Sequence, residues 1–209
     1  MTKFKELADH FAASGIATKG TITKLRRLMR EAGLLRSGGQ GNAARDIAIT
    51  DVTNLFLGLV AADQLNHAPG VISLCRAAAF NPDHSENCHP WPFTGITEET
   101  TLGEFLDRFF EGVVHSGIQP EYNWTNMSFE FDIVSGEFGC RAALWFDDGA
   151  QHHNICFNGF NSDTLAEIEQ GARELLPVVV SRVATVRDEF LRPLADFTID
   201  ALFPGEGEQ

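Results

Sequence analysis

The chain has 209 residues, of which 44% are hydrophobic, and its formal net charge at pH 7 is −13. This length fits one large domain or a small domain joined to a medium one, and the apolar content is sufficient for a packed core. No segment approaches the run of about 18 apolar residues that a membrane-spanning helix needs, and the first residues contain no apolar signal region. We therefore exclude a membrane protein and expect a cytoplasmic one.

Charge is distributed very unevenly along the chain. The first 48 residues hold nine Lys and Arg against four Asp and Glu, which gives +5. The remainder holds seven Arg against 25 acids, which gives −18. Basic segments serve polyanionic partners because Lys and Arg neutralise phosphates and release counterions. We therefore expect a DNA-binding head at residues 1–65 and an acidic body at residues 97–203 that does not contact nucleic acid.

Two short helices are predicted at the start of the head. Apolar residues recur at helical spacing between Phe4 and Phe11, and Ser14-Gly15 follows them, which predicts a helix over 4–13. A second helix is predicted from about residue 21 to residue 32, with Gly33 as its C-cap. Its apolar stripe consists of Ile22, Leu25, Leu28 and Met29. This arrangement is typical of a helix-turn-helix, whose second helix enters the major groove.

A glycine-rich segment follows the second helix. The sequence from Ser37 to Asn42 is too rich in glycine to hold a core, but it can form a flexible wing beside a DNA groove. Ile47–Ile49 is interpreted as a short returning strand. Thr50 is then expected to cap a third helix that carries Asp51 in its first turn.

The order of these features resembles the MerR-like winged helix-turn-helix, and the small subunits of some bacteriophage terminases look similar. The resemblance is carried by Glu6-Leu7-Ala8, Gly15-Ile16, Thr21-Ile22, Ala32-Gly33-Leu34-Leu35, the glycine-rich wing and Asp51-Val52 with Leu55. It covers less than a third of the chain. It implies a winged DNA-binding head that serves either a transcriptional regulator or the DNA-recognising subunit of a packaging terminase.

The expected DNA contacts lie on or beside the second helix and the wing. They are Lys19, Thr21, Lys24, Arg26, Arg27, Arg30, Arg36, Gln40 and Arg45. A solvated helix face is the alternative interpretation of the cations, but the wing, the cap and the confined basic charge together favour double-stranded DNA as the partner. Because a single head binds weakly, we expect a homo-oligomer, either a dimer or a larger ring.

Residues 66–96 contain four prolines and are predicted as an irregular connector, with a short helix at about 71–80 as an open alternative. Residue types that bind metals cluster here: Cys75, His84, Cys88 and His89. Zinc sites need closely spaced ligand pairs, whereas Cys88 and His89 are adjacent and no second pair is present. We therefore expect reduced, packed thiols and loop histidines, with no metal and no cofactor.

The acidic body begins with a capping box at Thr101 and Glu104, which predicts a helix as far as His115. Alternating apolar and polar residues then predict three strands at about 128–133, 140–146 and 152–157, joined as an antiparallel meander. The chain is predicted to be helical again from Ser162, with a new helix that starts at Pro177. Residues 204–209 are expected to be a disordered tail.

The predicted fold class is therefore α+β: an N-terminal winged helix-turn-helix followed by an acidic domain with a three-stranded antiparallel meander packed on helices. No catalytic sequence motif is present, so we expect no enzyme. The acidic body would oligomerise or bind a protein partner. An alternative is an interaction module or inhibitor whose acidic body mimics nucleic acid. Clustering of these acids on one surface would favour it: Glu98, Glu99, Glu104, Asp107, Glu111, Asp147 and Asp148.

Overall fold

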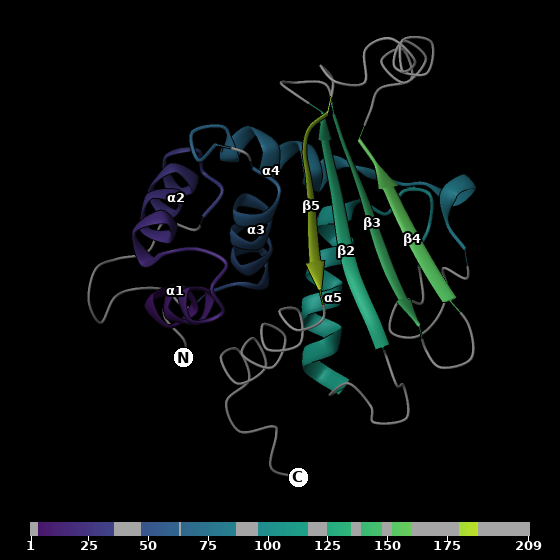
Figure 1. Ribbon diagram of the computed structural model, residues 1–209, viewed down its shortest axis with the longest axis horizontal. Coiled ribbons are helices and arrows are strands. Elements are labelled where there is room, and N and C mark those ends of the chain that lie inside the picture. The colour runs from purple at the N-terminus through teal and green to yellow at the C-terminus, as the bar shows by residue number, and fades with distance from the viewer. Residues whose placement is uncertain are drawn as a thin grey trace.

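The computed structural model describes residues 4–35, 47–62, 64–86, 96–116, 125–134, 139–147, 152–159 and 180–187. A group of helices lies on one side and an antiparallel sheet on the other, with α5 against the sheet (Figure 1). The architecture is thus a mixture of helices and antiparallel strands, as the α+β prediction requires. Among the described residues, no helix combines the length and the hydrophobicity needed to cross a bilayer.

The first two helices form where the sequence predicts them. Helix α1 spans Phe4–Ala13, and helix α2 spans Lys19–Glu31, two residues earlier at its start than expected. Thr18 is the N-cap of α2, and its hydroxyl accepts a hydrogen bond from the Thr21 N–H at 3.2 Å. Ser, Thr, Asp and Asn favour this position because their side-chain oxygens satisfy an otherwise unpaired N–H group of the first turn.

Helix α3, Ile49–Val60, corrects two predictions. The expected strand at Ile47–Ile49 is absent, because Ile47 and Ala48 have no regular structure and Ile49 already belongs to the helix. The N-cap is Ala48 rather than Thr50. The Asp51 carboxylate accepts the Ala48 N–H at 3.1 Å, so a third-position acid stabilises this helix start without a capping hydroxyl.

The predicted connector contains regular structure. Helix α4, Ala68–Ala77, is followed by the short strand β1, Ala79–Phe80, and the 3₁₀ helix η2, Pro82–His84. The short helix left open by the sequence is thus present, and it begins three residues earlier than expected. Pro69 lies in its first turn, where a missing N–H costs no hydrogen bond.

Helix α5, Leu102–Ser116, begins with the predicted capping box. The Glu104 carboxylate accepts the Thr101 N–H at 3.1 Å, and the Thr101 hydroxyl accepts the Glu104 N–H at 3.2 Å. Its buried face consists of Leu102, Phe105, Leu106, Phe109 and Phe110. The helix therefore turns one apolar face toward the core, as its sequence pattern predicts.

The sheet contains the predicted meander at its centre. Strands β2 (Thr125–Val134), β3 (Gly139–Asp147) and β4 (His152–Asn158) pair antiparallel in sequence order. Two further strands extend the sheet to the order β1-β4-β3-β2-β5. On β4, His153 is buried and His152 is exposed, so the two histidines lie on opposite faces as expected.

Strand β5, Val180–Arg187, shows that the helix predicted from Pro177 is wrong over these residues. It pairs antiparallel with β2, with Phe131 opposite Ala184 and Phe129 opposite Val186. The valines match helical spacing, but β-branched side chains favour strands. The predicted helix after Ser162, the hairpin turns of the meander and the tail at 204–209 lie outside the described residues.

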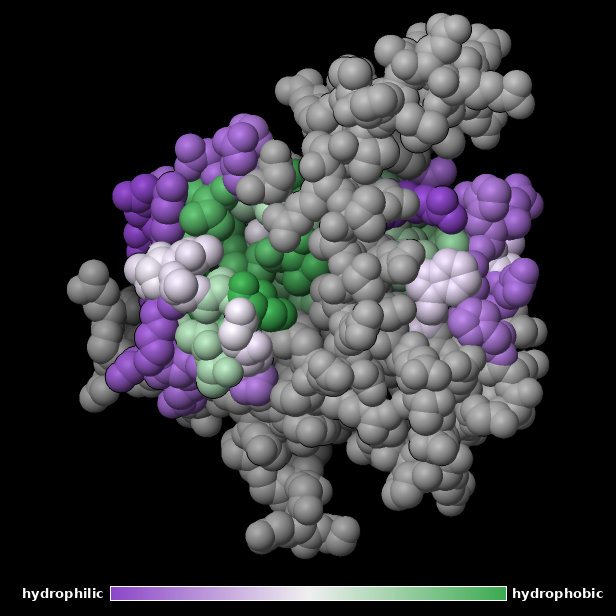
Figure 2. Space-filling view, in the orientation of Figure 1, coloured by the Kyte–Doolittle hydropathy of each residue, from purple (hydrophilic) through white to green (hydrophobic). Residues whose placement is uncertain are grey.

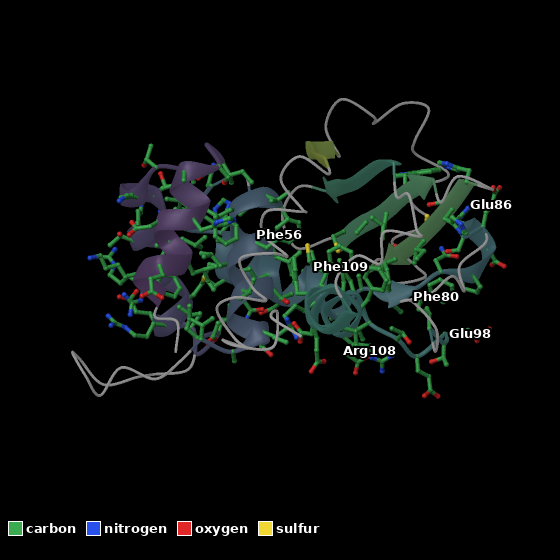
Figure 3. The ribbon with its side chains drawn as sticks, turned by 90° about the horizontal axis from the view of Figure 1, so that it is seen from below. Phe56, Phe80, Glu86, Glu98, Arg108 and Phe109 are labelled. Carbon is green, nitrogen blue, oxygen red and sulfur yellow. The ribbon has the colours of Figure 1, made fainter. Side chains whose placement is uncertain are left out.

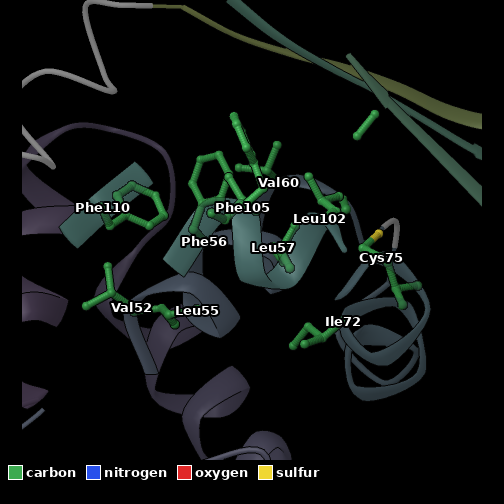
Figure 4. Close-up of a cluster of buried hydrophobic side chains, with 14 of the residues drawn as sticks. Val52, Leu55, Phe56, Leu57, Val60, Ile72, Cys75, Leu102, Phe105 and Phe110 are labelled. Atoms are coloured by element: carbon green, nitrogen blue, oxygen red, sulfur yellow. The ribbon is translucent and has the colours of Figure 1, made fainter. Parts of the chain in front are cut away.

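Buried apolar side chains form one cluster, which extends from Leu7 in α1 to Phe157 in β4. Helix α3 lies at its centre and contacts α2, α4 and α5 (Figure 4). Phe56 contacts Phe110 of α5 with ring centroids 5.7 Å apart. Gly58 permits α3 to pack closely against α2 and α4, because a Cβ there would lie 3.0 Å from side-chain atoms of both Leu25 and Ile72. The division of the chain into head, connector and body stays a prediction.

Candidate nucleic-acid interface

Helix α2 has one buried face and one exposed basic face. Ile22, Leu25 and Met29 are fully buried against the core. The exposed cations of the helix are Lys19, Lys24, Arg26, Arg27 and Arg30. Figure 2 shows hydrophilic residues along the outer edge of the α1–α2 pair. We call these five side chains the basic face of α2.

The end of α2 is fixed by a glycine cap, as the sequence predicts. Gly33 has φ +74°, the left-handed conformation that glycine adopts without a steric penalty. The Gly33 N–H donates to the Arg30 carbonyl at 3.1 Å, and the Leu34 N–H donates to the Met29 carbonyl at 2.8 Å. These two bonds form a Schellman motif, which satisfies carbonyls that the helix leaves open.

The five cations of the basic face do not all lie on the same side of α2. Residues that are four, seven or eleven positions apart share one side of a helix. Lys19, Arg26 and Arg30 therefore line the same side of α2, with Thr23 between them. Lys24 lies on the other flank of the exposed face. The basic face thus contains a stripe about three turns long.

Helix α1 contacts two cations of this stripe. The Asp9 carboxylate lies 2.7 Å from Lys19 Nζ, and the hydrogen bond from Lys19 holds the pKa of Asp9 below its usual value. The Arg26 guanidinium lies over the Phe4 ring, 4.4 Å from its centroid. The stripe therefore lies on the side of α2 that faces α1.

The remaining cations have different surroundings. Arg27 Nε lies 3.6 Å from a Glu31 carboxylate oxygen at i,i+4 spacing, and both side chains are 59% exposed. Exposed pairs of this kind contribute little to stability and leave the cation accessible. Within the described part of the chain, Lys24 and Arg30 form no ion pair or side-chain hydrogen bond.

The other predicted contacts have less support from geometry. Thr21 is half-buried, and its hydroxyl lies 3.0 Å from that of Thr18, within the helix cap. Arg36, Gln40 and Arg45 lie outside the described residues, as does the whole glycine-rich wing. The structure thus brings together the five cations of α2 and leaves the wing contacts as predictions.

Sequence reasoning missed the side chains that surround the cations. Glu31 could have been found, because it follows Arg27 by four residues on one helix. Phe4 and Asp9 could not, because their contacts depend on how α1 packs against α2. Phe4 was assigned only to the apolar stripe of α1, although it is half-buried and also contacts Arg26.

A half-buried polar network connects the helices behind the basic face. Arg76 of α4 donates to both carboxylate oxygens of Asp107 in α5, at 3.3 and 2.7 Å, and to the Asn54 side chain at 3.1 Å. Asn54 of α3 in turn donates to the Leu34 carbonyl at 2.7 Å. The residues that follow α2 are therefore tied to α5 through four side-chain hydrogen bonds.

The acids expected to form a nucleic-acid mimic belong to the later part of the chain, whereas Asp9 and Glu31 lie beside the basic face. Glu98, Glu99, Glu104 and Glu111 are exposed on α5 or the turn before it. Asp107 is half-buried and paired with Arg76. Glu86 and Glu98 lie at the opposite end of the molecule from α2 (Figure 3). The side chain of Asp147 and the whole of Asp148 lie outside the described part.

The described residues provide no metal centre. No group of three His, Cys, Asp or Glu in the described ranges could hold an ion. Cys75 is buried and its thiol is hydrogen-bonded with that of Cys140, whereas His84 is exposed. Cys88 and His89 lie outside the described ranges.

Comparison of the chain with protein-family models, curated proteins and solved structures finds no match in any of the three. The class of the protein therefore rests on the geometry of its own residues.

Proposed function

We propose that the protein binds double-stranded DNA through the basic face of α2, as part of a winged head at residues 1–65. The observation that carries this proposal is the exposure of all five cations on a single helix. The second helix of a helix-turn-helix enters the major groove, where cations neutralise phosphates and contact base edges. No catalytic activity is assigned.

The acidic body, in this proposal, oligomerises or binds a protein partner and stays clear of DNA. Two biological settings fit, transcriptional regulation and DNA packaging, and the protein would work in the cytoplasm in either. Sedimentation of the protein with and without DNA distinguishes them. A closed ring in solution favours packaging, and a symmetric dimer on a palindromic duplex favours regulation.

Duplex binding is tested by fluorescence anisotropy with a random pool of duplexes over a range of salt concentrations. If four or five phosphates are neutralised, log K should fall with log salt at a slope of about −4. The double variant Lys24→Glu/Arg30→Glu should lose binding, since neither cation has an ion pair or side-chain hydrogen bond in the described part of the chain whose loss would disturb the fold.

A matched control reverses two exposed cations elsewhere, Arg108 on α5 and Arg141 on β3. The Arg108→Glu/Arg141→Glu variant changes the net charge equally and should bind as the wild type does. Wild-type protein without any salt-dependent binding to the pool would refute the proposal. Equal loss in both double variants, with thermal melting showing both to be folded, would show a net-charge effect rather than a binding face.

A second candidate is an interaction module or inhibitor whose acidic body mimics nucleic acid. The exposed glutamates at 98, 99, 104 and 111 support it. Such a protein should compete with duplex DNA for a lysine-rich peptide, and the triple change Glu98→Gln/Glu99→Gln/Glu111→Gln should remove this competition. Unchanged competition in the triple variant would exclude these glutamates as the mimic.

A further inference from the structure

The five cations of α2 fall into three groups according to the side chains that their charged ends contact. Lys19 and Arg27 face carboxylates, which offset their charge. Lys24 and Arg30 have no ion pair within the described residues. Arg26 is different from both, because an uncharged ring fixes its position and leaves its full charge available.

We propose that Arg26 is the specificity-determining residue of the DNA interface and that Phe4 is its positioning residue. This inference rests on the proposed duplex binding. Arg26 would take the Hoogsteen edge of guanine, whose O6 and N7 atoms accept two parallel hydrogen bonds from a guanidinium. The other cations would contact phosphates and contribute affinity without reading sequence.

The Phe4 ring holds the guanidinium without using its hydrogen-bonding capacity. A ring interacts with a cation through its π face, whereas the five N–H donors of arginine form hydrogen bonds in the guanidinium plane. Arg26 is exposed, so its guanidinium can lie over Phe4 and still donate two parallel N–H hydrogen bonds to a partner with two acceptors.

Phe4 is itself fixed, because it is half-buried and packs against the hydrophobic core. An arginine restrained in this way loses less rotamer freedom on binding than an unrestrained one. Lysine at the same position would keep the charge but lose the planar fork. These properties distinguish Arg26 from Lys24 and Arg30, for which the described residues provide no aromatic ring of this kind.

The test uses a duplex that the full-length wild type enriches from a random pool, and a copy in which 7-deazaguanine replaces guanine. The replacement removes the N7 acceptor and leaves every phosphate unchanged. We expect the wild type to bind the copy roughly tenfold more weakly, which is at the low end of what a bidentate contact contributes, because O6 still accepts one of the two hydrogen bonds. Arg26→Lys should bind the guanine duplex more weakly and should distinguish it from the copy less than the wild type does, because an ammonium lacks the planar fork.

Phe4 is tested by two substitutions. Phe4→Leu should reduce the discrimination while the slope of log K against log salt stays unchanged, since the number of cations is the same. Phe4→Trp keeps a ring beneath the guanidinium and should restore the discrimination. Lys24→Gln is the control: it should weaken binding to both duplexes equally and reduce the salt slope by about one.

Full discrimination in Arg26→Lys would overturn the inference. If binding to both duplexes were also weakened equally, Arg26 would be placed on a phosphate. If thermal melting shows Phe4→Leu to be unfolded, Arg26→Lys alone decides. A wild type that binds no duplex refutes the proposed function instead, and that result is obtained before any variant is made.

Discussion

Thr53 of α3 carries a hydroxyl that the core does not use. The residue is fully buried, and among the described residues its Oγ1 has no hydrogen-bond partner. A buried hydroxyl without a partner loses its hydration without compensation, which costs about 1–3 kcal/mol on mutational scales. This single side chain therefore lowers the stability of a helix that is otherwise well packed.

Thr53→Val should therefore be neutral or should raise the free energy of unfolding by about 1 kcal/mol, because it keeps the shape and removes the unpaired oxygen. Urea denaturation followed by circular dichroism measures the change. Thr53→Ser is the matched control, since it keeps the hydroxyl, removes the methyl group and should destabilise the protein. A Val variant less stable than the Ser variant would show that the hydroxyl has a partner.

Cys75 is expected to be a poor nucleophile. The hydrogen bond with Cys140 and burial together raise the pKa of Cys75 well above its usual value. Alkylation by iodoacetamide at pH 8.5 should thus be slow in the native protein and fast in denaturant, as peptide mass spectrometry would show. Rapid native alkylation of Cys75 would contradict the buried geometry.

The raised pKa of Cys75 also makes the free energy of unfolding depend on pH. The contribution of the protonated thiol is fully present below about pH 8.5, the pKa of the unfolded thiol, and is lost as the pH rises toward the folded value.

At this scale the sequence predicted which side chains are exposed but not what they touch. Helical periodicity is local, so the exposed cations and the buried Ile22 and Leu25 followed from spacing alone. The contacts of Phe4 with Arg26 and of Asp9 with Lys19 join different helices. No spacing rule supplies the angle at which two helices pack.

Among the elements, α2 offers a test of its cap. Gly33→Ala should cost about 1–2 kcal/mol, because a Cβ is disfavoured at its positive φ even though no neighbouring atom blocks it. The measurement is urea denaturation of the variant beside the wild type.

Gly70→Ala is the matched control for that substitution. Gly70 is exposed in α4, has no positive φ and has open space around it, so alanine there should stabilise the protein by about 0.5–1 kcal/mol. Equal effects of the two substitutions would contradict the left-handed cap.

The sequence predicted well those helices that have capping residues or a stop signal, such as α1 and α5. It also predicted well the strands β2–β4, in which apolar and polar residues alternate. Strand β5 was not, because its valines at 180, 183 and 186 follow helical spacing, and only its pairing with β2 shows that these residues form a strand. The strand expected at Ile47–Ile49 was inferred from the wing it would complete, whereas the Asp51 cap starts a helix there. Long-range pairing and local caps thus overrode the pattern.

At the scale of the whole molecule, the hydrophobic core is continuous from α1 to β4. We therefore expect the helices and the sheet to unfold together. Leu25 of α2 is fully buried, so Leu25→Ala should cost about 2–5 kcal/mol. Far-ultraviolet circular dichroism reports on the helices, and the three tryptophans, all between residues 91 and 145, report on the later part of the chain. Both probes should shift to the same lower denaturant concentration.

A shift confined to circular dichroism would instead show that the head at residues 1–65 unfolds as an independent unit. That outcome would support the domain boundaries expected from composition and charge, and it would contradict cooperative coupling through α3.

A continuous chain of hydrogen bonds connects the residues after α2 to α5. It runs from the Leu34 carbonyl through the Asn54 side chain and the Arg76 guanidinium to the Asp107 carboxylate. A fragment truncated after residue 65 would keep every cation of α2 but lose Arg76 and Asp107, and it would expose the side of α3 that α4 and α5 cover. Minimal binding fragments cut at that point should therefore be aggregation-prone. Gene-level truncations intended to isolate the basic helix need to extend through α5.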